Sequence, residues 1–196
     1  MLEDVRRTYR FVAGGRAHRL VLCLRAPGVQ AMAVYRFGRW VLRRHKLVRL
    51  LGLLDLWYQI LALGVEVAWG IEIPRRARIG AGFYVGHSGG IVISSEAVIG
   101  RNCSISQGVT IGAGGQGARK GVPTVGDDVY IAPGACLYGR IRIGNNVKIG
   151  ANAVIYKDVP DNAVVALDPG FRVLSLKGNH PLAAPETAAG SGSGEA

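Results

Sequence analysis

Aliphatic residues recur at every sixth position through the middle and later part of this 196-residue chain. One two-residue slip and one longer gap interrupt the period, whose members are Val67, Ile73, Ile79, Val85, Ile93, Ile99, Ile105 and Ile111, then Val125, Ile131, Leu137, Ile143, Ile149 and Ile155. A helix repeats its buried face about every 3.6 residues and a strand every two, so neither explains this spacing. Hexapeptide repeats are typical of a parallel β-helix, in which three six-residue sides make a triangular coil of about 18 residues.

Glycine and small residues occupy fixed places within the period. Glycine accounts for 29 of the 196 residues, about twice its usual share, and no Gly-X-Y register indicates collagen. A small or modest residue stands four positions after many of the aliphatic ones: Ala77, Ala97, Cys103, Val109, Val129, Ala135, Val147 and Ala153. Because such residues permit tight corners, the sequence predicts a mainly β fold, a parallel β-helix with an α-helical N-terminal region.

One segment, residues 113–124, breaks the period between Ile111 and Val125. It is rich in glycine and carries Arg119 and Lys120. Loops excluded from a regular scaffold often carry function, although a tolerated insertion is the alternative. We therefore expect a loop that projects from the β-helix and contributes to a functional site.

Composition divides the chain into three parts. Residues 1–66 have Arg and Leu at three- and four-residue spacing, which predicts a helical region with helices near 29–45 and 47–66. Residues 67–177 carry the repeats and form the predicted β-helix domain. Residues 178–196 consist mainly of Ala, Gly, Ser, Pro and acids, so we expect a disordered tail.

Positive charge is concentrated in the first quarter of the chain. Residues 1–50 contain 12 Lys and Arg against two acids, a net charge of +10. The apolar run Leu50–Val65, interrupted by Asp55 and Gln59, is short for a membrane span. It is either an interfacial helix that brings residues 1–66 to a membrane surface or a surface that packs against other subunits or the rest of the chain. Aromatic residues are too few in the basic region to favour nucleic-acid binding.

The three cysteines, Cys23, Cys103 and Cys136, form no CxxC pair. The sequence therefore indicates neither a disulfide framework nor a zinc site, and we expect no metal. The first residues are acids and arginines rather than an apolar stretch with a cleavage site. We expect a cytoplasmic protein, located at the inner face of the membrane if its basic region contacts lipid.

His87 is the only histidine of the repeat region, and it lies where the period slips. A histidine next to a glycine at an irregularity of the repeat does not suit an inward ladder position. Histidine is the side chain best suited to general-base catalysis near neutral pH; an exposed structural histidine is the alternative. Glu72 lies fifteen residues earlier, so a coil of about 18 residues places the two on neighbouring coils. A carboxylate beside the imidazole would fix its tautomer, whereas a solvated glutamate beside Arg75 is the other interpretation.

Four segments resemble the serine acetyltransferase branch of the left-handed β-helix acyltransferases. They are His87–Ile93 (HSGGIVI), Ile105–Gly115 (ISQGVTIGAGG), Pro123–Asp127 (PTVGD) and Ile149–Pro160 (IGANAVIYKDVP). The likeness covers about residues 27–175 and implies a left-handed β-helix, a homotrimer, and acetyl-CoA bound in the groove between adjacent solenoids.

The resemblance also implies roles for particular residues. His87 falls on the family histidine that deprotonates the acceptor hydroxyl, and Glu72 falls on its carboxylate partner. The residues that would line the CoA groove are Gly112, Ala113, Pro133, Ala151 and Lys157. Small side chains there would let the pantetheine arm lie close to the coil, and the lysine could meet phosphate.

The sequence departs from this family where free serine is recognised. Gly86 replaces the Asp before the histidine, Ser94-Ser95 replaces Gly-Glu, and Gly121-Val122 replaces the Arg-His that precedes the loop-closing proline. A site without polar partners for the amino and carboxylate groups loses that recognition. We therefore expect an acetyl-CoA-dependent O-acetyltransferase acting on a small-molecule hydroxyl, in the first place a sugar of surface polysaccharide synthesis. The alternatives are a serine O-acetyltransferase of cysteine biosynthesis and a non-catalytic trimeric scaffold.

Overall fold

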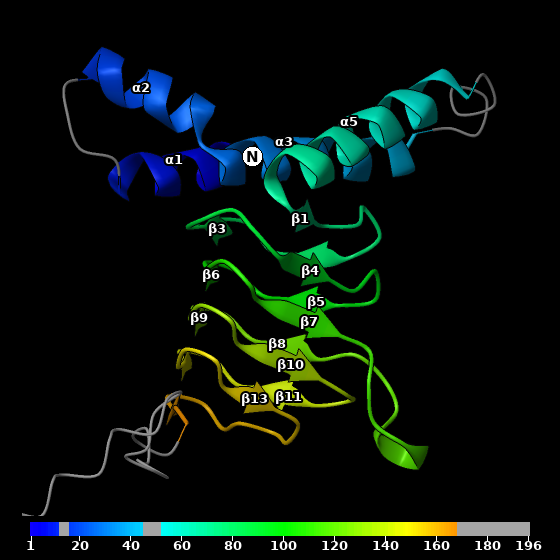
Figure 1. Cartoon of the computed structure of the whole chain (residues 1–196), viewed down its shortest axis with the longest axis vertical. Coiled ribbons are helices and arrows are strands. Elements are labelled where there is room, and N and C mark those ends of the chain that lie inside the picture. Colours follow the sequence, from blue (N-terminus) through cyan, green and yellow to red (C-terminus); the bar gives the residue numbers. More distant parts are fainter. Residues whose placement is uncertain (12–15, 45–51, 168–196) are drawn as a thin grey trace, which may run out of the picture.

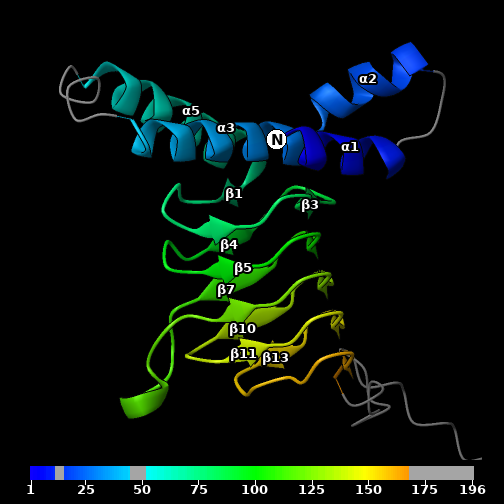
Figure 2. The same cartoon turned by 180° about the vertical axis from the view of Figure 1, so that it is seen from behind.

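A layer of helices covers one end of a triangular β-helix in the computed structural model, which describes residues 1–11, 16–44 and 52–167 (Figures 1 and 2). The helices are α1 (Leu2–Phe11), α2 (Arg16–Arg25), α3 (Pro27–Leu42) and α5 (Leu53–Trp69). The last two correspond to the predicted helices 29–45 and 47–66. The predicted disordered tail, residues 178–196, lies outside the described residues.

Local signals explain where the two longer helices begin and end. Pro27 is the first residue of α3, where its missing N–H has no helical partner to lose. Gly70 ends α5 with a left-handed φ of 60° and donates its N–H to the Glu66 carbonyl. The helix therefore extends through Val67, which is 79% exposed. The prediction that Val67 begins the aliphatic ladder is wrong, because the chain turns into the β-helix only after Gly70.

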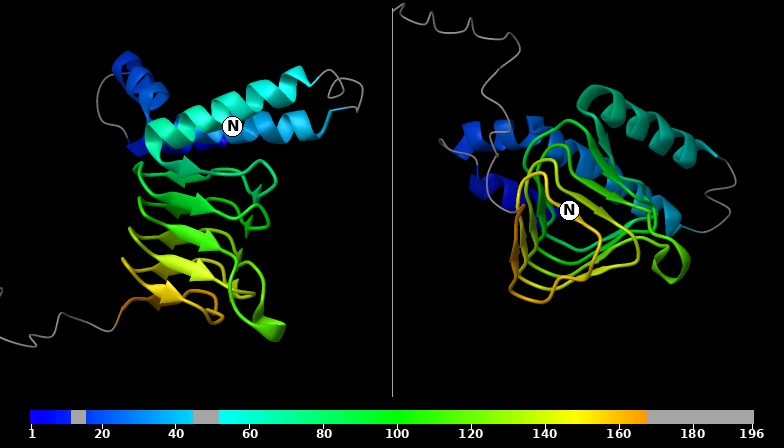
Figure 3. Two further views of the ribbon diagram at one scale, coloured as in Figure 1. Left: turned by 45° about the vertical axis from the view of Figure 1, so that its right-hand side comes forward. Right: turned by 60° about the horizontal axis from the view of Figure 1, so that its bottom comes forward.

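Short strands build the β-helix, and all of the ladder pairings between the described strands are parallel. They are β1 (Ile71–Glu72), β2 (Arg78–Ile79), β3 (Tyr84–Val85), β4 (Ile91–Ile93), β5 (Val98–Ile99), β6 (Ser104–Ile105), β7 (Thr110–Gly112), β8 (Thr124–Val125), β9 (Tyr130–Ile131), β10 (Cys136–Tyr138), β11 (Arg142–Ile143), β12 (Lys148–Ile149), β13 (Val154–Ile155) and β14 (Val164–Val165). They form three sheets in the orders β1-β4-β7-β10-β13, β11-β8-β5-β2 and β14-β12-β9-β6-β3. Figure 3 shows the resulting triangular cross-section.

The strand register locates both irregularities that the sequence predicts. Val92 pairs with Thr110, which is the spacing of a regular coil of three hexapeptides. Ile71 pairs with Ile91, two residues more than a regular coil, so the slip adds two residues at the His87 corner. Thr110 pairs with Cys136, so eight extra residues enter at the loop. The loop closes at its base through a Gly114–Gly121 bridge and carries a short 3₁₀ turn, Gly117–Arg119 (Figure 3).

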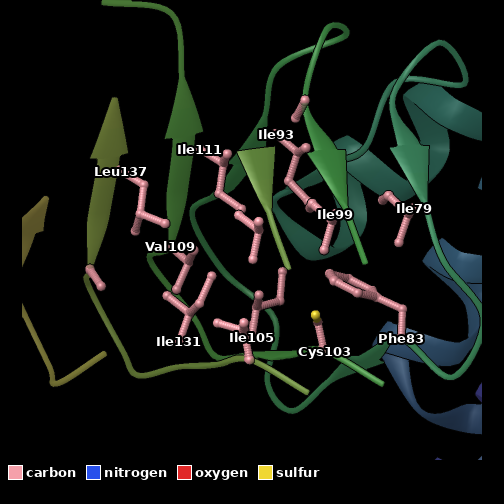
Figure 4. Packing of buried hydrophobic residues seen from close by; sticks show 14 of the residues in the cluster. Ile79, Phe83, Ile93, Ile99, Cys103, Ile105, Val109, Ile111, Ile131 and Leu137 are labelled. Carbon is pink, nitrogen blue, oxygen red and sulfur yellow. The ribbon is translucent and has the colours of Figure 1, made fainter. Parts of the chain in front are cut away.

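The core is the predicted ladder of aliphatic side chains. From Ile79 to Ile155 every member of the six-residue period is buried, and Figure 4 shows many of them pointing inward toward one another. The small residues between them are also buried: Ala77, Ala97, Cys103, Val109, Val129, Ala135, Val147 and Ala153. Removing each large aliphatic side chain from water contributes about 1.5–3 kcal/mol.

Two corners of the triangle repeat a left-handed backbone residue in every coil. One corner has Gly82, Asn102, Asp128, Asn146 and Asn162, and the other has Gly70, Gly90, Gly108, Gly134 and Asn152, all with positive φ. Glycine and asparagine adopt this conformation at the lowest cost. Successive corners are joined by backbone hydrogen bonds, for example from Asn152 N–H to the Pro133 carbonyl at 2.8 Å.

The helical layer satisfies the open end of the β-helix with polar side chains. The Tyr35 hydroxyl donates to the Ala77 carbonyl at 2.9 Å and accepts from the Ile79 N–H at 3.0 Å. Arg36 donates to the Ile79 carbonyl at 2.7 Å and to Asp4 at 3.0 Å, and Asp4 accepts from the Phe83 N–H at 2.9 Å. These groups would otherwise form an unpaired strand edge.

Asp4 is ionised by this network. Its burial favours the neutral acid, but the hydrogen bonds and charge of Arg36, together with the Phe83 N–H, outweigh that effect and hold the pKa of Asp4 below its ordinary value. The network joins α1, α3 and the first coil.

Candidate active site

His87 lies on the corner between β3 and β4, where the slip adds two residues. Gly89 and Gly90 turn this corner with φ values of 103° and 65°, and Gly89 donates its N–H to the Trp69 carbonyl at 2.8 Å. The His87 side chain is exposed and, among the described residues, makes no hydrogen bond or ion pair. The relaxed corner therefore presents an imidazole outward, as a general base requires.

Glu72 lies on β1, one coil away from the His87 corner. It pairs with Val92, five residues after His87, and its side chain is exposed. Within the described ranges no hydrogen bond or ion pair joins Glu72 to His87. Glu72 instead lines a pocket of about 200 Å³ between α3, α5 and β1, together with Tyr35, Tyr58 and Glu66. Its role as the carboxylate partner of His87 stays a prediction.

Pro133 and Ala151 share the edge of the sheet on which His87 lies. Backbone hydrogen bonds join successive coils along this edge. Gly108 N–H donates to the Gly89 carbonyl at 2.8 Å, and Gly134 N–H donates to the Gln107 carbonyl at 2.9 Å. The structure thus places His87, Pro133 and Ala151 along one corner of the triangle.

Gly112, Ala113 and Lys157 lie on the opposite edge of the same sheet. Gly112 ends β7 and pairs with Tyr138, and Lys157 follows β13 after Tyr156. The five residues predicted to line the CoA groove therefore do not form one cleft within a single chain. They divide between two corners, with the sheet β1-β4-β7-β10-β13 between them.

A pocket under the projecting loop contains residues that sequence reasoning missed. It has a volume of about 230 Å³ and is lined by Tyr138, Tyr156, Ile141, Arg119 and neighbouring loop residues. The two tyrosine rings stack with centroids 6.2 Å apart. The tyrosines are separated by one regular coil along the sequence, and that spacing is the signal that could have identified them.

One cation lies beside this aromatic pair, and an arginine lines the pocket. The Lys157 ammonium lies 5.5 Å from the centroid of the Tyr156 ring. Arg119 comes from the 3₁₀ turn of the loop, and its backbone carbonyl accepts from the Arg140 N–H at 2.9 Å. The pocket therefore combines flat apolar walls with positive charge, a combination suited to a ring that carries an anionic group.

The other groups with potential for chemistry are poorly placed for it. Burial raises the pKa of Cys103 to about 11, and its thiol donates to the Gly126 carbonyl at 3.1 Å inside the core. Such a buried thiol is unsuited to nucleophilic catalysis. No group of three or more His, Cys, Asp or Glu side chains in the described part of the chain could hold a metal ion.

Comparisons with known proteins agree with the fold. The family model of the bacterial transferase hexapeptide (six repeats) matches residues 123–157. A serine acetyltransferase of Synechococcus elongatus is 37% identical over 81% of this chain and 61% of that protein. One of Mycobacterium tuberculosis is 40% identical over 74% of this chain and 59% of that protein.

Solved structures give the same result. Serine acetyltransferase of Brucella abortus in complex with coenzyme A has a TM-score of 0.71 at 30% identity, over 86% of this chain and 64% of that one. Serine acetyltransferase isoform 3 of Entamoeba histolytica, in complex with cysteine, also has a TM-score of 0.71. It is 28% identical, over 89% of this chain and 59% of that one. The chain spans about three fifths of the length of these relatives. It belongs to the hexapeptide-repeat, left-handed β-helix acyltransferase superfamily, on its serine acetyltransferase-like branch.

Proposed function

We propose that this chain is an acetyl-CoA-dependent O-acetyltransferase in which His87 is the general base. The observation that carries the proposal is the outward imidazole, without a partner among the described residues, at the corner that the two-residue slip enlarges. The named relatives, which are serine acetyltransferases, support it.

His87 would act on both partners of the transfer. Its neutral imidazole removes the proton of the acceptor hydroxyl, and the hydroxyl oxygen attacks the thioester carbonyl carbon of acetyl-CoA. The C–S bond then breaks, and the imidazolium returns the proton to the departing thiolate. Acetyl-CoA supplies the thioester as a co-substrate. A rearrangement that brings the Glu72 carboxylate to the imidazole would stabilise the imidazolium.

The division of the groove residues between two corners supports a site shared by two copies in a homotrimer. His87, Pro133 and Ala151 of one copy would face Gly112, Ala113 and Lys157 of the next. Mixing two inactive variants tests this arrangement. His87→Ala and Ala113→Trp each remove one half of the site, and mixed trimers should regain activity because some sites contain two intact halves. No recovery in mixed trimers would contradict the shared site.

The pocket under the loop is the place for the nucleotide end of acetyl-CoA. The pocket lies between the levels of β10 and β13, which are two and three strand steps from β4 beside His87. It is therefore about 10–14 Å farther along the solenoid axis. The pantetheine arm would cover this distance, with the adenine beside Tyr156 and a phosphate near Arg119 or Lys157.

L-Serine is the first acceptor to test. Both named curated relatives are serine acetyltransferases, and neither named comparison points to a sugar, so the expectation of a polysaccharide sugar as first acceptor has no support from them. A sugar hydroxyl remains the second candidate because of Gly86, Ser94-Ser95 and Gly121-Val122, which leave out the family's polar groups for free serine.

A thiol-release assay separates these functions. Purified full-length chain is incubated with acetyl-CoA and either L-serine or a panel of nucleotide sugars. Release that depends on serine supports a serine acetyltransferase, and release that depends on a sugar supports the second candidate. Absence of acceptor-dependent release with every compound would favour the non-catalytic scaffold.

A further inference from the structure

The helix α5 presents an uncovered apolar face. Six large apolar side chains on it are 52–79% exposed: Leu53, Leu56, Trp57, Ile60, Leu63 and Val67. Their spacing of three and four residues places them on one side of the helix, which we call the α5 apolar face. The two acids of the helix lie elsewhere, because Asp55 is paired with Arg75 and Glu66 lines the pocket above β1.

The opposite side of α5 is fixed to the rest of the protein. Tyr58 is buried, its hydroxyl accepts from the Arg75 N–H at 3.1 Å, and the Arg75 guanidinium lies 4.6 Å from the centre of its ring. The ring also packs against Gly38 of α3. The α5 apolar face therefore has a fixed orientation and takes no part in the core of this chain.

Further apolar side chains are exposed at the same end of the molecule. Val21, Leu22 and Leu24 of α2 are exposed, as is Trp40 near the end of α3. Figures 1 and 2 show α2 and α5 at the end of the molecule opposite to β13. No helix within the described ranges is long and apolar enough to cross a membrane.

Positive charge accompanies these apolar side chains. Residues 5–54 contain 12 Lys and Arg and no acid. Arg43 and Arg44 are exposed at the end of α3, and the Arg44 guanidinium lies 4.2 Å from the centre of the Trp40 ring. The sequence between α3 and α5 adds Lys46 and Arg49. An apolar helix face with Trp and flanking cations is typical of elements that lie in a membrane interface.

We propose that the helical end of the protein binds the surface of an anionic phospholipid bilayer. The α5 apolar face enters the boundary between headgroups and acyl chains, and Arg43 and Arg44 contact lipid phosphates. A second copy on the same face would bring two strongly cationic ends together, with Glu3 and Glu66 as the only exposed acids of the described helices. An anionic bilayer is complementary to both the charge and the apolar surface. The proposal is independent of the acyl-transfer reaction.

Vesicle flotation with the full-length chain tests this proposal. We expect binding to vesicles of equal parts phosphatidylcholine and phosphatidylglycerol, and weak binding to phosphatidylcholine alone. The double variant Leu56→Glu/Ile60→Glu should lose binding. Its matched control, Val164→Glu/Leu167→Glu, places the same two changes on side chains of similar or greater exposure at the far end of the chain and should bind like the wild type.

A second pair of variants isolates the charge. Arg43→Gln/Arg44→Gln should weaken binding to the anionic vesicles roughly 30-fold, about fivefold for each cation removed. Arg142→Gln/Lys148→Gln removes two exposed cations of the β-helix and should leave binding unchanged.

Three results would overturn the proposal. The first is no binding of the wild type to anionic vesicles, and the second is equal binding by the Leu56→Glu/Ile60→Glu variant with an unchanged melting curve. The third combines two measurements: the wild type does not bind vesicles, and the particle mass of the Leu56→Glu/Ile60→Glu variant in analytical ultracentrifugation is lower than that of the wild type. This result would assign the α5 apolar face to a second copy.

Discussion

The β-helix and the helical layer bury their surfaces in different ways. In the β-helix one position in six repeats the same inward aliphatic residue, and each coil satisfies the backbone of the next. The helical layer relies on single long-range contacts, such as the bond between Asp4 and the Phe83 N–H, and leaves the α5 apolar face uncovered. The β-helix is thus a regular frame that carries the candidate site, while the helical layer caps one end of it and leaves an apolar face exposed.

Replacing one histidine in each region should show that only the histidine of the β-helix affects the rate of acetyl transfer. His87→Ala should lower the rate of acetyl transfer by about 10²–10⁴-fold, the usual contribution of one general base. His18→Ala, on the exposed side of α2, should leave the rate unchanged. Steady-state thiol release measures both, and equal rates for wild type and His87→Ala would contradict the general-base assignment.

Truncating apolar side chains should show which region holds the fold. Ile111 is fully buried between Ile93 and Leu137, so Ile111→Ala should lower the free energy of unfolding by about 2–5 kcal/mol. Leu56→Ala on the α5 apolar face should change it by less than about 0.5 kcal/mol. Urea denaturation compares the two, and a large loss for Leu56→Ala would mean that the face is part of a core.

The hydrogen bonds and ion pair of Asp4 should contribute to stability by joining the helical layer to the β-helix. Asp4→Asn should lower the free energy of unfolding by about 2–3 kcal/mol at neutral pH, whereas the exposed neighbour Glu3→Gln should have little effect. Because the folded-state pKa of Asp4 lies below its ordinary 3.8, its contribution is complete above that value and is lost as the pH falls through the folded-state pKa.

Denaturation from pH 7 downward measures this contribution. The difference between wild type and Asp4→Asn should disappear in acid. A difference that is independent of pH would show that the carboxylate charge is not what couples the regions.

Replacing glycine by alanine should change the stability of the protein in opposite directions in the two regions. A Cβ on Gly100 would lie 2.5 Å from the Gly126 carbonyl oxygen of the next coil, so Gly100→Ala should destabilise the protein by about 1–3 kcal/mol. A Cβ on Gly64 of α5 would meet nothing within 4 Å, so Gly64→Ala should stabilise it by about 0.5–1 kcal/mol. Thermal unfolding of both variants measures the signs, and destabilisation by Gly64→Ala would reveal a close neighbour of α5.

Sequence periodicity could predict the β-helix because each buried residue repeats a local rule. The ladder from Ile79 to Ile155 and the small residues at its corners follow from spacing alone. The same period misplaced Val67, since an aliphatic residue in a helix can fall on a multiple of six by coincidence. The left-handed φ of Gly70, which ends α5, decides the boundary.

Contacts between distant parts of the chain could not be predicted in this way. Nothing in the local pattern links Asp4 to Phe83, far along the chain. The corner position of His87 follows from the slip, whereas the division of Pro133 and Ala151 from Gly112 and Lys157 depends on which corner of the triangle each residue occupies. Tyr138 and Tyr156 meet only because the chain returns to the same corner after one full coil.

Acceptor-dependent release of CoA thiol is the most direct test of whether the enlarged corner carries an acetyl-transfer site. Initial rates are compared with and without L-serine or a nucleotide sugar, for the wild type and for His87→Ala. We expect release that requires one of these acceptors and is largely lost in the variant. Release that ignores every acceptor, or that survives unchanged without the imidazole, would contradict it.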